Sequence, residues 1–318
     1  MSLKYGLILP QGYGRELLGI KDPIEAYETM TRMAQVAEES GFEAVWTADH
    51  FQTAPVPTQE TFFECWTTTA ALARDTKRIR VGQMVTANSY RNPALQAKMA
   101  STLDVLSHGR YTFGIGAGYY EPDYRMYGYE YPEPGVRLSQ LREAVQVIRA
   151  LWSSEEATFE GTYYHIHNAI NQPKGVQKPH IPLMIAGGGE KVTLKLVAQY
   201  ADVCNVMGES AAITHKFNVL KQHCETVGRD YESIYRTAVA PCCIGETDEE
   251  ARALFHATPQ PPFPGDPLAY GLIGSLETVR QRVADYETAG VQELDLWFVE
   301  GTNPEALRRF AREFIFCS

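Results

Sequence analysis

Short apolar runs alternate with longer amphipathic segments along almost the whole chain. The short runs are rich in Val, Ile, Leu and aromatic residues and predict buried β-strands, whereas the longer segments have apolar residues at helical spacing. The predicted strands lie at residues 5–10, 44–49, 80–85, 111–116, 182–186, 202–206, 235–244 and 293–298.

Amphipathic helices are predicted between these strands. In the first of them, Pro23 in the first turn and Gly41 after the last turn are the expected start and stop signals. The predicted helices cover residues 22–40, 61–75, 93–106, 135–152, 190–201, 211–228, 248–255, 276–289 and 304–316. Two segments interrupt the alternation: residues 153–180, with a small hairpin expected near 158–166, and the proline-rich residues 257–274.

Strand–helix units that repeat in this way predict parallel strands joined by helices, and eight strands favour closure into a barrel. An open doubly wound sheet that binds a nucleotide would have Gly-x-Gly-x-x-Gly after its first strand, but the chain has Gln11-Gly12-Tyr13-Gly14-Arg15 there. We therefore predict an α/β fold, a (β/α)8 TIM barrel in a single domain spanning residues 1–318. Insertions are expected after strand 4 and within the region from strand 7 to strand 8.

Composition and net charge indicate which kinds of binding partner are not expected. Hydrophobic residues make up 44% of the chain, enough for a real core, and 29 Lys and Arg against 39 Asp and Glu give a net charge of −10. This charge argues against nucleic-acid and acidic-membrane partners. No apolar run approaches the ~20 residues of a membrane span, and residues 1–10 show no secretory signal. The six scattered cysteines are typical of reduced thiols, so we expect a cytoplasmic protein.

Residues that directly follow the strands are the candidates for chemistry, because barrels of this kind place their sites at the strand carboxyl ends. Asp49-His50-Phe51 follows the second predicted strand, where a carboxylate beside an imidazole can orient a ring or exchange a proton. The alternative is that Asp49 caps a loop and His50 is polar surface. A glycine inside the third strand, Gly82, suggests a bulge or an unusual peptide, although a plain barrel strand is the alternative.

Two glycine-rich turns permit close approach of a ligand to the backbone. The first, residues 114–118, follows the fourth strand and leads to Glu121, either a buried acid or a partner of Arg125. The second, Gly187-Gly188-Gly189, opens the predicted fifth helix, and helix N-termini bind anions. We expect a phosphate group there.

The remaining motifs do not indicate a metal site or another class of enzyme. His165 and His167 alternate on the expected hairpin and are interpreted as polar strand residues, so no metal site is predicted. Gly-x-Ser-x-Gly, His-Glu-x-x-His and Walker patterns do not occur, which leaves hydrolase, zincin and P-loop functions without support. The tyrosine-rich residues 119–131 and the proline-rich residues 257–274 are expected to shape a substrate pocket.

Taken together, several of these stretches resemble the bacterial luciferase-like oxidoreductases, specifically the branch that uses the deazaflavin coenzyme F420. The matching stretches lie at residues 40–51 (SGFEAVWTADHF), 90–95, 103–110, 114–118, 185–189 and 200–205, and they follow the family order over nearly the whole chain. The resemblance implies a TIM barrel, usually dimeric, with the coenzyme at the strand carboxyl ends.

The resemblance also implies roles for particular residues. His50 would be the acid/base near the reacting carbon, with Glu121 as a further acid, and a non-proline cis peptide would lie at Gln83-Met84. Relatives that oxidise glucose 6-phosphate have a glutamate directly after Gly-x-Gly, where this chain has Tyr119, so a sugar-phosphate substrate is not expected. The residues expected to contact the coenzyme are Asp49, Gln83, Met84, Asn88, Gly116, Gly118, Ala186, Gly187, Gly188 and Gly189. Arg91, Lys191 and Lys195 are candidates to pair with its anionic tail.

The sequence therefore predicts an F420-dependent oxidoreductase that transfers a hydride between the coenzyme's C5 carbon and a small organic substrate. Two alternatives remain open. One is an FMN-dependent monooxygenase of the same fold, and the other is a barrel that binds the deazaflavin without catalysis.

Overall fold

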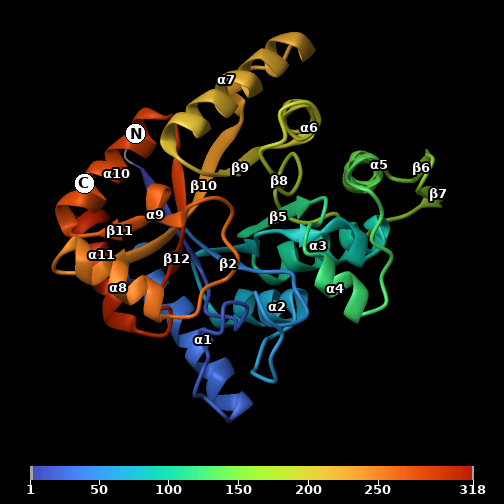
Figure 1. Cartoon of the computed structure of the whole chain (residues 1–318). Helices are drawn as coiled ribbons and strands as arrows, with labels where there is room; N and C mark the ends of the chain where they lie inside the picture. Colours follow the sequence, from blue (N-terminus) through green and yellow to red (C-terminus); the bar gives the residue numbers. More distant parts are fainter. Residues whose placement is uncertain (1–2, 317–318) are drawn as a thin grey trace.

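Parallel strands close into a barrel in the computed structural model of this chain, which describes residues 3–316 (Figure 1). The order around the barrel is β1 (Lys4–Ile8), β2 (Ala44–Thr47), β3 (Arg80–Gln83), β5 (Tyr111–Gly116), β8 (Leu183–Ala186), β9 (Val203–Met207), β10 (Tyr235–Ile244) and β12 (Glu293–Phe298). Closure is visible at Leu7, which lies opposite Val45 of β2 on one side and Leu296 of β12 on the other. The predicted (β/α)8 fold is confirmed.

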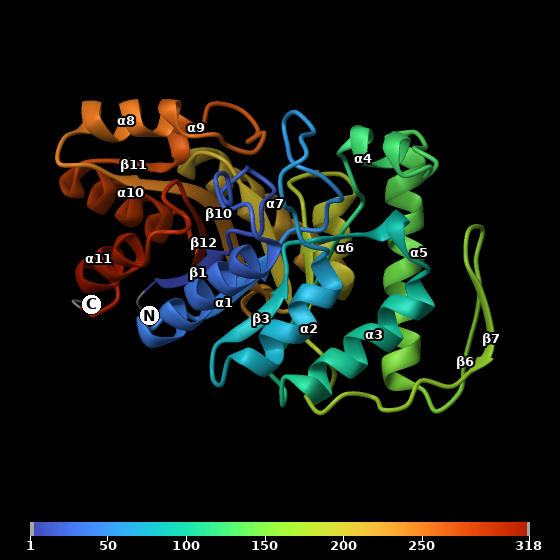
Figure 2. The same cartoon turned by 90° about the horizontal axis from the view of Figure 1, so that it is seen from below.

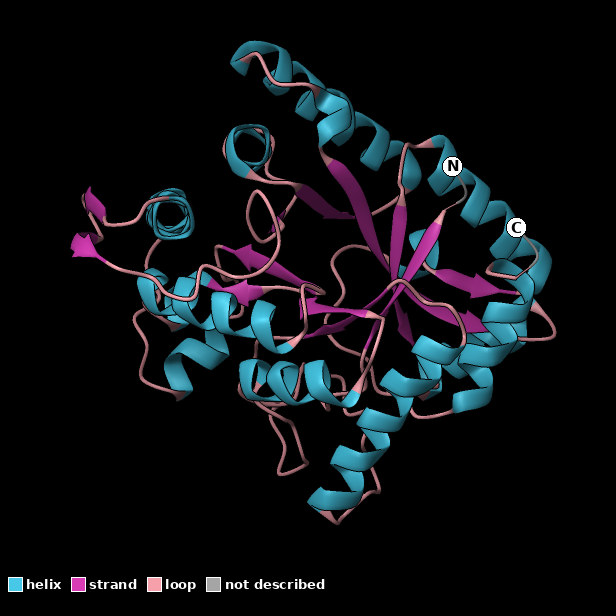
Figure 3. Cartoon of the chain, turned by 180° about the vertical axis from the view of Figure 1, so that it is seen from behind, coloured by secondary structure: helices cyan, strands magenta, loops and turns pink. Residues whose placement is uncertain are grey.

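Helices surround this ring of strands (Figure 3). They are α1 (Pro23–Glu39), α2 (Cys65–Asp75), α3 (Pro93–Leu106), α4 (Glu121–Met126), α5 (Pro134–Ser153), α6 (Thr193–Tyr200), α7 (Ser210–Val227), α8 (Asp248–Ala257), α9 (Pro267–Tyr270), α10 (Leu276–Thr288) and α11 (Pro304–Phe314), with short 3₁₀ turns at Asn88–Tyr90 and Tyr231–Ser233. Local capping sets their ends. Asp22 accepts a hydrogen bond from the Ile24 amide at the start of α1, and Gly228 takes the left-handed conformation after α7.

Two helices begin later than predicted. Helix α2 begins at Cys65 instead of residue 61, because the Glu64 carboxylate caps it by accepting from the Trp66 and Thr67 amides. Helix α6 begins at Thr193 instead of residue 190, because residues 190–192 form a turn that the Leu194 amide closes on the Gly189 carbonyl. The glycine triplet therefore precedes a turn and does not itself open the helix.

Both insertions are present. The antiparallel hairpin of β6 (Ala157–Glu160) and β7 (His165–Ala169) stands outside the barrel beside α5 (Figure 2). Glu143 of α5 holds its turn by accepting hydrogen bonds from backbone amides of residues 162–164. In the second insertion, α9 leads to β11 (Leu272–Gly274), which pairs in parallel with the last three residues of β10. This strand and β4 (Thr86–Ala87), which pairs with β5, were too short to predict.

Polar side chains occupy part of the barrel interior. Arg80 donates to Glu293 at 2.5 Å, and Asp295 accepts from the Trp46 indole at 2.6 Å. Burial and the negative charge of Glu293 raise the pKa of Asp295 well above its usual value. The apolar core lies outside this layer, between strands and helices, where Phe113 and Leu141 are fully buried.

Glu38 near the end of α1 fastens the segment that leads into β3. Its Oε1 accepts hydrogen bonds from the amides of Lys77, Arg78 and Ile79 at 2.8, 2.5 and 2.9 Å. Desolvation raises the pKa of this carboxyl, but the three amides outweigh it, so the pKa lies below its usual value of 4.5. A depressed carboxyl pKa stabilises the fold above the unfolded-state value, and this stability is lost as the pH falls through the folded-state value.

We expect Glu38→Ala to lower the free energy of unfolding by about 1–2 kcal/mol at pH 7. Because protonation weakens the same contacts in the wild type, the difference should shrink towards pH 3. Urea unfolding at both pH values measures it, with the neighbouring exposed Glu39→Ala as control. An equal loss at both pH values would show that the charge of Glu38 is unimportant.

Candidate active site

A cavity of ≈ 850 Å³ lies at the carboxyl ends of the barrel strands. The segments after most of the barrel strands contribute to its walls. The predicted site residues that line it are Asp49, His50, Met84, Gly116, Gly118, Ala186, Gly187 and Gly188. Four predicted site residues are not among its lining: Gln83, Asn88, Gly189 and Glu121.

His50 is held in one orientation by two neighbours. Its Nδ1 lies 2.7 Å from Oδ2 of Asp123, and its ring stacks on that of Tyr13 with the centroids 3.9 Å apart and the planes 7° from parallel. An Nδ1–H that donates to the carboxylate leaves Nε2 as the proton acceptor. The His50 side chain is only 12% exposed and that of Asp123 is fully buried, so water competes little for this pair.

Asp123 is a residue that the sequence did not single out. It lies on the short helix α4, in the segment that follows β5. Its second oxygen, Oδ1, is buried without a hydrogen-bond partner among residues 3–316. A carboxylate in this position can hold the imidazole of His50 through Nδ1.

Glu121 lies two residues before Asp123, at the surface. Its Oε1 accepts from Nε and Nη2 of Arg125 at 2.8 and 2.6 Å, and its side chain is 43% exposed. This is the alternative that the sequence left open, an ion pair one helical turn apart. The carboxylate that reaches His50 is that of Asp123.

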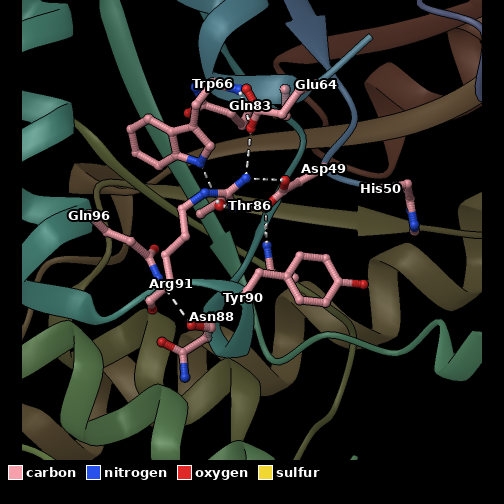
Figure 4. Close-up of polar contacts among 12 residues, drawn as sticks. Asp49, His50, Glu64, Trp66, Gln83, Thr86, Asn88, Tyr90, Arg91 and Gln96 are labelled. Atoms are coloured by element: carbon pink, nitrogen blue, oxygen red, sulfur yellow. Dashed lines mark hydrogen bonds and ion pairs between the residues drawn. The ribbon is translucent and has the colours of Figure 1, made fainter. Parts of the chain in front are cut away.

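Asp49 is turned away from His50 and towards Arg91 (Figure 4). Its oxygens accept from both Nη atoms of Arg91 at 2.7 and 3.0 Å, and from the Thr86 hydroxyl and Ala87 amide at 2.7 and 3.0 Å. Arg91 also contacts Glu64. Burial lowers the pKa of Arg91, but the Asp49 charge more than compensates, so the guanidinium stays charged. The guanidinium of Arg91 is therefore already paired with carboxylates of the protein itself.

The non-proline cis peptide lies at Met84-Val85, one bond beyond the predicted Gln83-Met84. Gln83 instead completes β3 opposite Thr47, and its side chain bonds to Thr69 and Tyr111. Asn88 is likewise buried and donates to the Tyr164 hydroxyl at 3.1 Å. Gln83 and Asn88 are therefore buried behind the residues that form the cavity surface, whereas Met84 lines the cavity.

Gly187 and Gly188 form the cavity wall after β8, as predicted. Gly187 has φ +125°, which strongly favours glycine, and a Cβ on Gly188 would lie 2.7 Å from Nζ of Lys216. Nζ also donates to the Met207 carbonyl at 3.1 Å. Lys216 comes from α7, far along the sequence, so nothing local linked it to the glycines. Lys191 and Lys195 are exposed and do not line the cavity.

The tyrosine-rich segment divides into two parts. Tyr119 and Tyr120 line the cavity, whereas Tyr127 and Tyr129 pack on Phe51 beside it. The proline-rich segment also reaches the cavity, through residues 261–264. Both segments thus contribute to the pocket as expected.

Residues 3–316 contain no group of three or more His, Cys, Asp or Glu side chains placed to hold a metal ion. Over the same residues, every helix is too short or too polar to cross a bilayer.

The fold and the site together define a class: a (β/α)8 barrel with a cavity at its strand carboxyl ends, lined by glycine turns and by His50. The chain belongs to the luciferase-like monooxygenase family, whose family model matches residues 5–264.

Known proteins resemble the chain in sequence and in fold. The F420-dependent glucose-6-phosphate dehydrogenase of Kineococcus radiotolerans is 36% identical over 184 residues, 55% of this chain and 52% of that protein. The enzyme of the same name from Gordonia bronchialis is 31% identical over 238 residues, 69% of this chain and 66% of that protein. The chain thus spans about half to two thirds of these relatives. An F420-dependent secondary alcohol dehydrogenase, solved with an F420–acetone adduct, superposes with a TM-score of 0.81 at 21% identity, covering 98% of both chains.

Proposed function

We propose that this protein is an F420-dependent oxidoreductase that transfers a hydride between the C5 carbon of the deazaflavin and a small organic substrate. The observation that carries the proposal is that two features meet at one cavity: Lys216 beside the Gly187 and Gly188 backbone, and the His50 imidazole backed by Asp123. The first suits an anion and the second suits proton transfer. The names of the relatives in the same family support the choice of coenzyme.

The residues present fit this coenzyme. The ammonium of Lys216 beside the Gly187 and Gly188 backbone suits a phosphate group, which needs charge and donors together. Gly116, which has no side chain, and Met84 leave the middle of the cavity accessible to a flat ring. We assign Asp49 to the wall beside that ring. When bound, coenzyme F420 accepts or donates a hydride at C5.

His50 acts as the acid/base for the substrate. Its Nε2 takes the proton of a substrate hydroxyl during oxidation and returns it to a carbonyl oxygen during reduction. Asp123 is a positioning residue, because it holds the imidazole through Nδ1 and balances the charge that His50 gains. The Tyr13 ring restricts rotation of the imidazole from the other side.

Coenzyme choice is tested by fluorescence titration with F420 and with FMN. We expect F420 to bind, and Lys216→Ala to weaken this binding at least tenfold, since hydrogen bonds to charged groups contribute about 1.5–3 kcal/mol. Lys221→Ala, an exposed lysine on the same helix, is the control. Binding of FMN alone would overturn the proposal in favour of a monooxygenase.

A protein that binds F420 without catalysis would show no hydride exchange with any alcohol or ketone. Loss of the visible absorbance of the oxidised coenzyme on addition of an alcohol is the expected result for an enzyme. We further propose that the chain acts as one domain in a cytoplasmic homodimer. The buried free cysteines 65, 204, 224, 242 and 243 suit a reducing compartment, and light scattering tests the dimer.

A further inference from the structure

The side of the cavity around His50 is built from aromatic rings. This aromatic wall consists of Tyr13, Tyr119, Tyr120, Phe263 and Trp297, which come from segments far apart in the chain. The Tyr120 ring lies edge-on to His50, with centroids 5.4 Å apart and planes at 86°. Phe263 and Trp297 meet edge-to-face at 6.2 Å and 85°. A ligand that reaches Nε2 of His50 from the cavity therefore lies against rings.

Prolines extend this wall. Pro261, Pro262 and Pro264 flank Phe263 and also line the cavity. Since proline has no backbone N–H, this segment presents apolar surface and few donors. It is packed in place, because a Cβ on Gly14 would lie 2.6 Å from the Trp297 ring and 2.7 Å from Pro261. The loop after β1 and the proline-rich segment therefore close on each other beside the wall.

The basic side chain of the cavity lies elsewhere. Of the described residues that line it, Lys216 is the one lysine or arginine, and it lies beside Gly188. The Asp49 charge is balanced by Arg91. Burial raises the pKa of the Tyr13, Tyr119 and Tyr120 hydroxyls, so these phenols stay neutral. Next to His50 the wall thus offers rings and hydroxyls.

We propose that the substrate is an uncharged alcohol or carbonyl compound with an apolar body, such as a cyclic or aromatic ring. This inference rests on the proposed function and deepens it. An apolar body gains about 25 cal/mol per Å² buried against the wall. A substrate phosphate or carboxylate would lose its hydration there without a cation to replace it, because the proposed coenzyme phosphate occupies Lys216.

The chemistry balances for such a substrate. In oxidation, the carbinol carbon loses a hydride to C5 of the coenzyme, its hydroxyl proton passes to Nε2 of His50, and the C–O single bond becomes C=O. The coenzyme gains the two electrons that the alcohol loses. The reverse transfers reduce a ketone.

Binding of a matched pair of ketones tests the inference without turnover. 4-Methylcyclohexanone and 4-oxocyclohexanecarboxylate have the same ring and similar size, but one is neutral and the other is an anion. In calorimetry with the protein loaded with oxidised F420, neither ketone reacts. We expect the neutral ketone to bind at least tenfold more tightly. Equal affinities, tighter binding of the carboxylate or no binding of either ketone would overturn the inference.

Two variants of the wall sharpen this test. Phe263→Ala should weaken binding of the neutral ketone about five- to tenfold and leave F420 affinity unchanged, whereas Tyr163→Ala, on the turn between β6 and β7, should change neither. Phe263→Arg should shift the preference towards the carboxylate. Loss of F420 binding in the separate titration would defeat the proposed function, whereas loss of the preference for the neutral ketone with F420 still bound would defeat only this inference.

Discussion

Replacing His50 by alanine should lower turnover by about 10²–10⁴-fold and leave the affinity for F420 nearly unchanged, because general acid–base catalysis contributes this much to rate. The imidazole is the one histidine ring among the described residues that line the cavity, and Asp123 and Tyr13 hold it in place. The wall at Gly188 and Lys216, where we propose that the coenzyme phosphate binds, is formed by other segments and should stay intact. Single-turnover reduction of F420 measures the rate, and fluorescence titration measures the affinity.

His167→Ala is the matched control, since this histidine is exposed on β7 outside the cavity. Asp123→Asn tests the positioning role separately. It should reduce the turnover number with little effect on KM, and by less than His50→Ala does, because the imidazole itself remains. Unchanged turnover in His50→Ala would remove His50 from the mechanism.

Replacing Arg91 by alanine should lower the free energy of unfolding by about 3–5 kcal/mol, as expected when one partner of a buried ion pair is removed. The Asp49 carboxylate is fully buried and the Arg91 side chain is 13% exposed, so loss of the guanidinium leaves a buried carboxylate with only the Thr86 and Ala87 donors. Urea unfolding measures the change.

Two comparisons isolate the cause. Asp49→Asn combined with Arg91→Ala should recover part of the stability, because the buried charge is removed with its partner. Arg125→Ala breaks the exposed pair with Glu121 and should cost less than about 1 kcal/mol. Similar losses for Arg91→Ala and Arg125→Ala would contradict a role for burial.

Elements bounded by strong local signals were predicted closely. The helix at Pro93–Leu106 has proline at its first position and His108-Gly109 after its end, and its predicted bounds match. The strands at Tyr111–Gly116 and Glu293–Phe298 also match their predicted bounds. The start of α2 is set by the side chain of Glu64, and the sequence pattern placed this start too early.

The candidate site was predictable in part for the same reason. Strand ends and glycine turns are local features, so Asp49, His50 and the glycines 187 and 188 could be expected at the cavity. The identity of the carboxylate that contacts His50 does not depend on local sequence. Glu121 and Asp123 lie two residues apart on α4, and only the packing of that helix brings Asp123 to the imidazole and leaves Glu121 at the surface.

The order of apolar and polar residues by itself determined that this chain forms eight strand–helix units and that its glycine turns and Asp49-His50 lie at one end of them. Tertiary structure alone decided the partners: Asp123 for His50, Arg91 for Asp49 and Lys216 for Gly188. The physical reason is that periodicity reflects burial of each segment, which is a local property. A charge pair depends instead on distances of a few ångströms between segments that only barrel closure brings together.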